Sequence, residues 1–119
     1  QWHIRAPLDA NAMQAACRHL LGSHDFRTFE GAGSPRQHSV RELLRAEWLN
    51  PRDHLLEFYI TANGFLRYMV RNIVGTLVEV GLGKRSPAEI PALIAARDRS
   101  QAGPTAPPQG LCLMQVRYG

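Results

Sequence analysis

The segment from Gly64 to Gly83, GFLRYMVRNIVGTLVEVGLG, constrains the fold of this chain more than any other stretch. It is about five helical turns long, with glycine at both ends and no proline inside. Its apolar residues recur at helical spacing and form one broad stripe, made of Phe65, Met69, Ile73, Leu77 and Val80 together with Thr76. The pattern predicts a core helix from Phe65 to Val80.

Two residues of this segment do not suit a plain core helix. Glycine inside a helix costs about 1 kcal/mol relative to alanine, so we expect another segment to approach the backbone closely at Gly75. Arg71 has no carboxylate three or four residues away that could pair with it along the helix. Its charge must either extend to solvent or meet an anion from elsewhere in the fold, and the sequence leaves both readings open.

The N-terminal third predicts one helix and one helical turn. Asp9 suits an N-cap and Gly22 a stop, and the apolar stripe between them consists of Met13, Ala16, Cys17, Leu20 and Leu21. A short turn should then place Phe26 and Phe29 inward. The loop that follows is rich in glycine and carries Arg36 and His38.

The rest of the chain predicts a hairpin, a second helix and a final strand. Strand-like alternation runs over Val40–Leu49, with Val40, Leu44, Ala46 and Trp48 on one face, and over His54–Ala62. Ser86 to Glu89 suits a capping box. The helix should either kink at Pro91 or start nearer to it, and it should end near Arg97. Leu111–Tyr118 alternates as a strand. The predicted core includes Leu56, Phe58, Ile60, Met69, Ile73, Leu77, Leu113 and Val116.

These elements predict one α+β domain over residues 1–119, with an antiparallel sheet packed on one face by helices. No apolar run approaches the length of a membrane span. Cys17 and Cys112 lie in apolar contexts, so we expect reduced thiols in a cytoplasmic protein rather than a disulfide.

The charge balance favours a polyanionic partner. The net charge is +4 and the pI about 9.7, and 13 of the 14 basic residues are arginine. The planar fork of arginine suits phosphate, which points to nucleic acid. A genome rich in G and C would account for the arginine bias equally well.

The usual signatures of a cofactor or metal site are missing from the sequence. No glycine-rich phosphate loop follows a strand, and no cysteine–histidine set has metal-ligand spacing. We therefore expect no metal site. His24 and Asp25 could form an acid–base pair, but a role for Asp25 as the cap of a short helix is the favoured reading.

Several motifs together resemble the C-terminal half of the tRNA pseudouridine synthase A family. They are GFLRYMVRNIVGTLVEVGLGK, DRSQAGPTAPPQGLCL and the final VRY, preceded by PLD and LLGSHDFRTF. The resemblance covers nearly the whole chain, although Arg36 to Arg41 departs from the arginine–threonine pattern expected there. It implies an enzyme without a cofactor that isomerises uridine to pseudouridine in the anticodon stem–loop of tRNA and acts as a homodimer.

The resemblance also implies that this chain is half of an enzyme. The catalytic aspartate of the family belongs to an N-terminal Gly-Arg-Thr-Asp motif, which these 119 residues do not contain. The chain is therefore expected to be a fragment of the catalytic fold and inactive alone. The alternative is a stand-alone RNA-binding module, for which the basic charge and the mixed α+β pattern would suffice.

The resemblance assigns roles to two residues, and four more are candidates for RNA contacts because of their charge or aromatic ring. Arg71, in MVRN, matches the arginine partner of the catalytic aspartate, and Leu111, in GLCL, matches an apolar residue that lines the base pocket. The expected RNA-binding residues are Arg36, Arg41 and Arg67, at phosphates, and Tyr68, which could stack on a base. A solvated surface role is nearly as consistent with each of these arginines taken singly.

Overall fold

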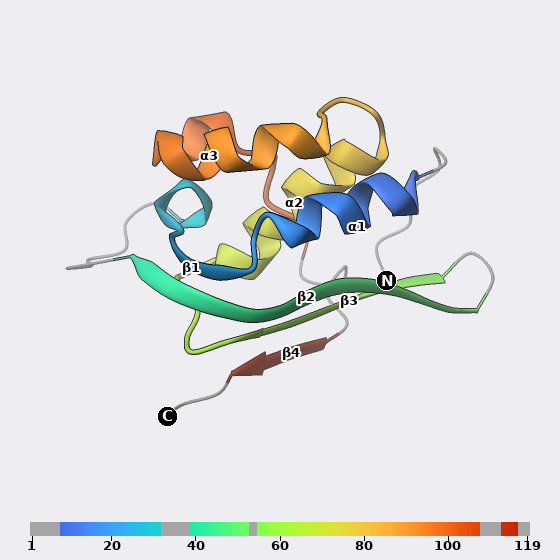
Figure 1. Ribbon diagram of the computed structural model, residues 1–119, viewed down its shortest axis with the longest axis horizontal. Coiled ribbons are helices and arrows are strands. Elements are labelled where there is room, and N and C mark those ends of the chain that lie inside the picture. Colours follow the sequence, from blue (N-terminus) through green and yellow to red (C-terminus); the bar gives the residue numbers. More distant parts are fainter. Residues whose placement is uncertain (1–7, 32–38, 53–54, 108–112, 117–119) are drawn as a thin grey trace.

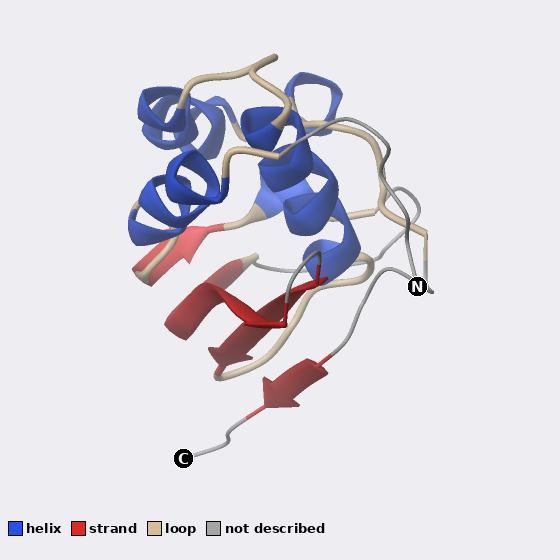
Figure 2. Cartoon of the chain, turned by 90° about the vertical axis from the view of Figure 1, so that its right-hand side faces the viewer, coloured by secondary structure: helices blue, strands red, loops and turns tan. Residues whose placement is uncertain are grey.

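The computed structural model describes residues 8–31, 39–52, 55–107 and 113–116. These residues form an α+β fold in which helices cover one face of a four-stranded sheet (Figures 1 and 2). The strands are Gly22–Asp25 (β1), Val40–Arg52 (β2), Leu55–Ala62 (β3) and Leu113–Val116 (β4), and the helices are Ala10–Arg18 (α1), Met69–Gly81 (α2) and Ile90–Ala96 (α3). The predicted fold class is confirmed.

The sheet follows the order β1-β2-β3-β4, and the direction of β4 differs from the prediction. The first three strands are antiparallel, whereas β4 runs parallel to β3, pairing Leu113 with Tyr59 and Val116 with Ala62. Between β3 and β4 the chain crosses the helical layer through α2 and α3, and a crossover of that kind joins parallel neighbours. An alternating sequence predicts a strand without predicting its direction.

The predicted faces of β2 are wrong in part because its register shifts. Leu43 pairs with Ala62 and Arg45 with Thr61, so an extra residue is inserted between the two pairs. After such a bulge the side chains no longer follow strict alternation. Leu43 and Ala46 are therefore buried, whereas Leu44, which was expected to share a face with Ala46, is 50% exposed.

The region after α1 holds a strand that was not predicted, followed by the helical turn that was predicted. Gly22 to Asp25 pairs with β2 as β1, and a 3-10 helix follows at Arg27–Phe29. Phe26 and Phe29 are fully buried, as predicted. The inward placement of Leu21 is wrong, because α1 ends at Arg18 and Leu21 no longer follows helical spacing; it is 41% exposed.

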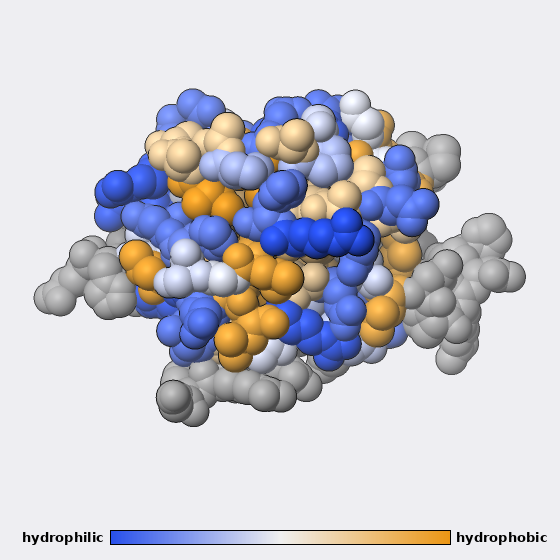
Figure 3. Space-filling view, in the orientation of Figure 1, coloured by the Kyte–Doolittle hydropathy of each residue, from blue (hydrophilic) through white to orange (hydrophobic). Residues whose placement is uncertain are grey.

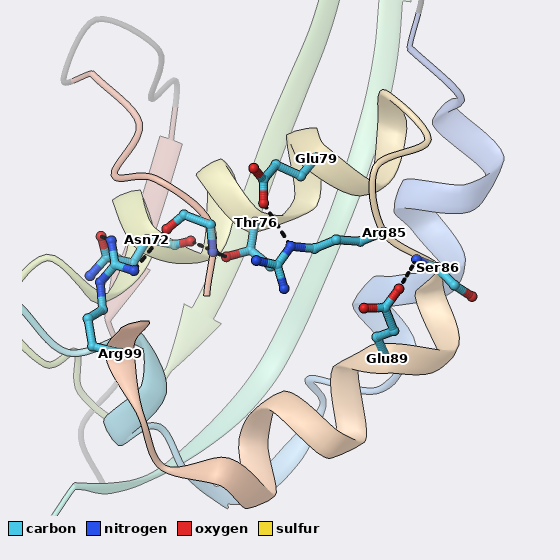
Figure 4. A network of polar contacts seen from close by, with 8 residues as sticks. Asn72, Thr76, Glu79, Arg85, Ser86, Glu89 and Arg99 are labelled. Carbon is cyan, nitrogen blue, oxygen red and sulfur yellow. Dashed lines mark hydrogen bonds and ion pairs between the residues drawn. The ribbon is translucent and has the colours of Figure 1, made fainter. Parts of the chain in front are cut away.

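Both predicted helix starts with side-chain caps are confirmed. The Asp9 carboxylate accepts a hydrogen bond from the Ala12 amide at 3.0 Å. Ser86 and Glu89 form the capping box, with the Ser86 amide donating to Glu89 Oε2 at 2.6 Å (Figure 4). The box opens a 3-10 turn, Pro87–Glu89, that continues as α3, and Arg97 in a left-handed conformation ends it.

The central helix begins at Met69 and not at Phe65. Tyr68 has φ 59° and ψ 8°, a left-handed conformation that cannot continue a right-handed helix. From Met69 onward α2 buries nearly every residue, and its Met69, Ile73 and Leu77 share the core with Phe58 and Ile60, as predicted. Leu56 is partly buried, and the side chains of Leu113 and Val116 lie outside the described part.

The sheet leaves apolar side chains at the surface. Val40, Leu44 and Leu49 of β2 are 46%, 50% and 39% exposed. Figure 3 shows apolar atoms reaching the surface in the lower half of the molecule, where the sheet lies, between hydrophilic side chains. Among the described helices, none has the length and apolar character needed to cross a membrane.

Candidate functional site

Two arginines flank an exposed tyrosine where the chain enters α2. The guanidinium carbons of Arg67 and Arg71 each lie 5.1 Å from the centroid of the Tyr68 ring, and Tyr68 is 43% exposed. Contacts of this kind attract a cation to the negative face of an aromatic ring. We call these three residues the Tyr68 cluster. It presents two positive charges and one aromatic face at a single surface.

The backbone at Tyr68 is strained, and Gly31 holds it in place. A residue with a side chain pays about 1–2 kcal/mol for a left-handed conformation. The Gly31 amide donates to the Arg67 carbonyl at 2.8 Å, and a Cβ on Gly31 would lie only 2.4 Å from Tyr68 Cδ2. The ring therefore lies directly against a backbone that must be glycine. Strain of this kind gathers at functional sites.

Arg71 is anchored at one side of its guanidinium. Its Nε donates to the Ala106 carbonyl at 2.8 Å, and the Ala106 amide donates back to the Arg71 carbonyl at 2.9 Å. The side chain is partly buried. No ion pair within the described ranges includes Arg71. Its remaining N–H donors can therefore take an anion in a bidentate pair.

Ala106 belongs to a segment, residues 102–107, that packs directly on α2. A Cβ on Gly75 would lie 1.6 Å from the Pro104 carbonyl oxygen, which confirms the close approach predicted at this glycine. A Cβ on Gly103 would lie 2.9 Å from Thr76 Cα, and the Gly103 amide donates to Thr76 Oγ1 at 2.9 Å (Figure 4). Gly75 in α2 and Gly103 in the segment thus allow the backbone of the segment to lie directly against the backbone of the helix.

Comparison with known proteins identifies the family. The family model described as tRNA pseudouridine synthase matches residues 16–119. The chain belongs to the tRNA pseudouridine synthase family. The predicted resemblance is thereby confirmed.

Individual synthases of this family are similar along almost the whole chain. Those named tRNA pseudouridine synthase A from Moorella thermoacetica and Myxococcus xanthus are 50% and 44% identical over 117 residues, which is 98% of this chain. The one from Bacillus pumilus is 49% identical over 116 residues. The chain covers 47%, 44% and 47% of these three relatives, so it spans about half of their length.

Of the other residues predicted to lie at the site, the structure describes one and not the other two. Arg41 donates from Nη1 to the Val40 carbonyl at 2.7 Å, and its Nε would lie 3.4 Å from a Cβ on Gly64, four residues before Tyr68. Arg36 and Leu111 lie outside the described residues. The structure therefore brings Arg67, Tyr68 and Arg71 together, and their predicted roles stay predictions.

Asp25 has a structural role. Its Oδ1 accepts from the Arg27 amide at 3.1 Å and from the Ser39 hydroxyl, and its Oδ2 lies 3.2 Å from Arg97 Nε. Asp25 thus bonds the first residue of the 3-10 helix, but the N-cap of that helix is Phe26 and not Asp25 as predicted. Burial raises the pKa of Asp25, but these hydrogen bonds and the nearby arginines outweigh burial and lower it below the ordinary value. His24 donates from Nε2 to the Leu21 carbonyl at 2.7 Å. The two do not form a pair.

The sequence reading missed Arg99, the most connected arginine near the site. Arg99 donates to the Gly103 carbonyl at 2.9 Å and to Asn72 Oδ1 and Thr105 Oγ1 at 3.1 Å each. It lies within the DRSQAGPTAP motif, and that was the only available signal, because its partner Asn72 is 27 residues away. Among the described residues, no group of three or more histidine, cysteine, aspartate or glutamate side chains could hold a metal.

Proposed function

We propose that this chain is one half of a tRNA pseudouridine synthase that isomerises uridine to pseudouridine in the anticodon stem–loop of tRNA. In this proposal Arg71 is the partner of a nucleophilic aspartate that the other half of the enzyme supplies. The observation that carries the proposal is the anchored guanidinium of Arg71, which has a fixed direction and, in the described part of the chain, no carboxylate partner.

The reaction explains why an aspartate would need this arginine. The target base must first leave the helical stack, at a cost of a few kcal/mol. A carboxylate then acts as the nucleophile while the glycosidic bond breaks, the base turns and a carbon–carbon bond forms. Burial in a pocket that excludes water raises the pKa of such a carboxylate, and an arginine within about 4–6 Å opposes that rise. Arg71 would keep the nucleophile ionised and aimed.

The same half would bind tRNA through the rest of the Tyr68 cluster. Arg67 is exposed and has its guanidinium over the Tyr68 ring, where it can reach a phosphate. The exposed ring of Tyr68 can stack on any of the four bases, because each base has a flat aromatic face. Arg41 and Arg36 would add phosphate contacts, and Leu111 would line the base pocket. The net charge of +4 favours this partner.

A conversion assay on two proteins tests the proposal. The pure 119-residue chain should form no pseudouridine in tRNA, whereas a complete synthase chain that includes these residues should form it in the anticodon stem–loop. Turnover by the 119 residues alone would contradict the half-enzyme role. If the complete chain bound tRNA tightly and converted nothing, the stand-alone RNA-binding reading would replace ours.

A further inference from the structure

Arg71 owes its direction to the carbonyl of Ala106, so whatever places that carbonyl also places Arg71. The segment that bears it runs along α2 against the direction of the helix, with Gly103 at Thr76 and Ala106 at Arg71. Near its middle, the close contact between Pro104 and Gly75 fixes how near the segment lies to the helix. Arg99 ties this segment to α2 beside Arg71, because it bonds both Thr105 and Asn72.

Arg99 and Asn72 form a clamp around Thr105. The two N–H bonds from Arg99 Nη2 reach Asn72 Oδ1 and Thr105 Oγ1, and the Thr105 hydroxyl donates to the same Asn72 oxygen. Asn72 cannot turn, because it is fully buried and its Nδ2 donates to the Phe29 carbonyl at 2.7 Å. Its oxygen must therefore face Arg99 (Figure 4). These bonds hold Thr105, which is the residue directly before Ala106.

We propose that Arg99 is a positioning residue for Arg71, acting through Thr105 and the carbonyl of Ala106. The inference rests on the proposed function of Arg71. Without the Arg99 fork, Thr105 would keep only its bond to Asn72, and Gly103 would lose the bond to its carbonyl. The segment would then be free to shift, and a misplacement of about 1 Å in a catalytic group can cost about 100-fold in rate.

Kinetics of a complete synthase chain that includes these residues give the first test. Arg99→Ala should lower the single-turnover rate of bound tRNA by roughly 10- to 100-fold and leave the affinity for tRNA within about twofold. Thr105→Val keeps the shape of the side chain, removes its hydroxyl and should act in the same direction. Arg85→Ala is the matched control. Arg85 forms an ion pair at 2.7 Å with Glu79, which lies on α2, and it forms no ion pair with residues 102–107.

A double-mutant cycle separates positioning from general weakening of the fold. If Arg99 acts through Arg71, adding Arg99→Ala to Arg71→Ala should change the rate by less than about twofold. An equal loss of rate in both backgrounds would overturn the inference. So would a loss in Arg99→Ala no greater than that in Arg85→Ala.

Hydrogen exchange tests the clamp without any turnover. The Ala106 amide, bonded to the Arg71 carbonyl, should lose protection in Arg99→Ala, while the Leu82 amide, bonded to Val78 in the same helix, should keep it. Unchanged protection at Ala106 would overturn the inference even in an active enzyme. Loss of protection at Ala106 in Arg99→Ala, together with no pseudouridine formation by the complete chain without the substitution, would support the clamp and contradict the proposed function.

Discussion

Gly75 and Pro104 are in backbone contact: a Cβ on Gly75 would lie 1.6 Å from the Pro104 carbonyl oxygen. No rotamer change can relieve such a clash, since the obstructing atom belongs to the main chain. The glycine therefore costs α2 some helix propensity and in return lets residues 102–107 lie on the helix, where Ala106 meets Arg71. A site residue is thus positioned by a glycine one turn away from it.

We predict that Gly75→Ala destabilises the fold even though alanine favours helices. The gain of about 1 kcal/mol in propensity should be outweighed by an overpacking cost of 1–3 kcal/mol or more, because the segment must move. The urea unfolding midpoint measures the balance. Gly64→Ala is the control: its Cβ would meet only the Arg41 side chain, at 3.4 Å, so its midpoint should barely change. A higher midpoint for Gly75→Ala would refute the contact.

Asp25 should make the fold sensitive to acid. Its pKa is lowered below the ordinary value of 3.8, so the folded state binds its proton less readily than the unfolded state does. The stability it contributes is therefore present above that ordinary value and is lost as the pH falls through the folded pKa. Asp25→Asn should cost about 1 kcal/mol near pH 7, and this difference should shrink below about pH 4.

Ser39→Ala provides the matched test of that mechanism. Removing the Ser39 hydroxyl takes away the largest influence that lowers the pKa of Asp25, so the folded pKa should move up toward the ordinary value. The stability lost in acid should then be smaller and should be complete at a higher pH than in the wild type. Parallel curves of unfolding free energy against pH for wild type, Asp25→Asn and Ser39→Ala would show that Asp25 does not act this way.

Cys17 should resist thiol reagents in the folded chain. Burial raises the pKa of Cys17 to about 12, and the residue is 1% exposed. The thiol is therefore almost entirely protonated at pH 8, and the thiolate is the reactive form. Labelling with iodoacetamide in a Cys112→Ser variant should be negligible until denaturant is added. Rapid labelling under native conditions would contradict the burial of this thiol.

The sequence predicted what depends on neighbours along the chain. The Asp9 cap, the Ser86–Glu89 capping box and the paired burial of Phe26 and Phe29 all follow from spacings of three residues. The close approach at Gly75 was also predictable, because a costly glycine in a core helix requires a reason. Arg71 stood out for a similar reason, as a charge in an apolar helix.

Features that depend on contacts between residues far apart in the sequence could not be predicted from it. The strand β1 consists of Gly22 to Asp25, which has no apolar alternation and is a strand because β2 pairs with it. The start of α2 was misplaced because Tyr68 is held left-handed by Gly31, 37 positions earlier in the chain. The contacts of Arg99 with Asn72 likewise belong to the tertiary structure alone.

Arg67 should contribute to tRNA binding and little to the chemical step. Its guanidinium lies over Tyr68 at the surface, and no ion pair in the described part of the chain holds it. In a complete synthase chain, Arg67→Ala should weaken tRNA binding and reduce the slope of log affinity against log salt by about one phosphate contact. Titrations at several salt concentrations measure that slope. An unchanged slope would remove Arg67 from the phosphate contacts.

The most direct test of the central claim compares Arg71→Ala with Arg67→Ala in a complete synthase chain, by single-turnover rate and tRNA affinity together. Arg71→Ala should lower the rate far more than the affinity, because Arg71 serves the carboxylate. Arg71→Lys should recover little of that rate, since lysine keeps the charge but not the planar fork. If Arg71→Ala lost only affinity while Arg67→Ala lost only rate, the two arginines would have the opposite roles and the account would be wrong.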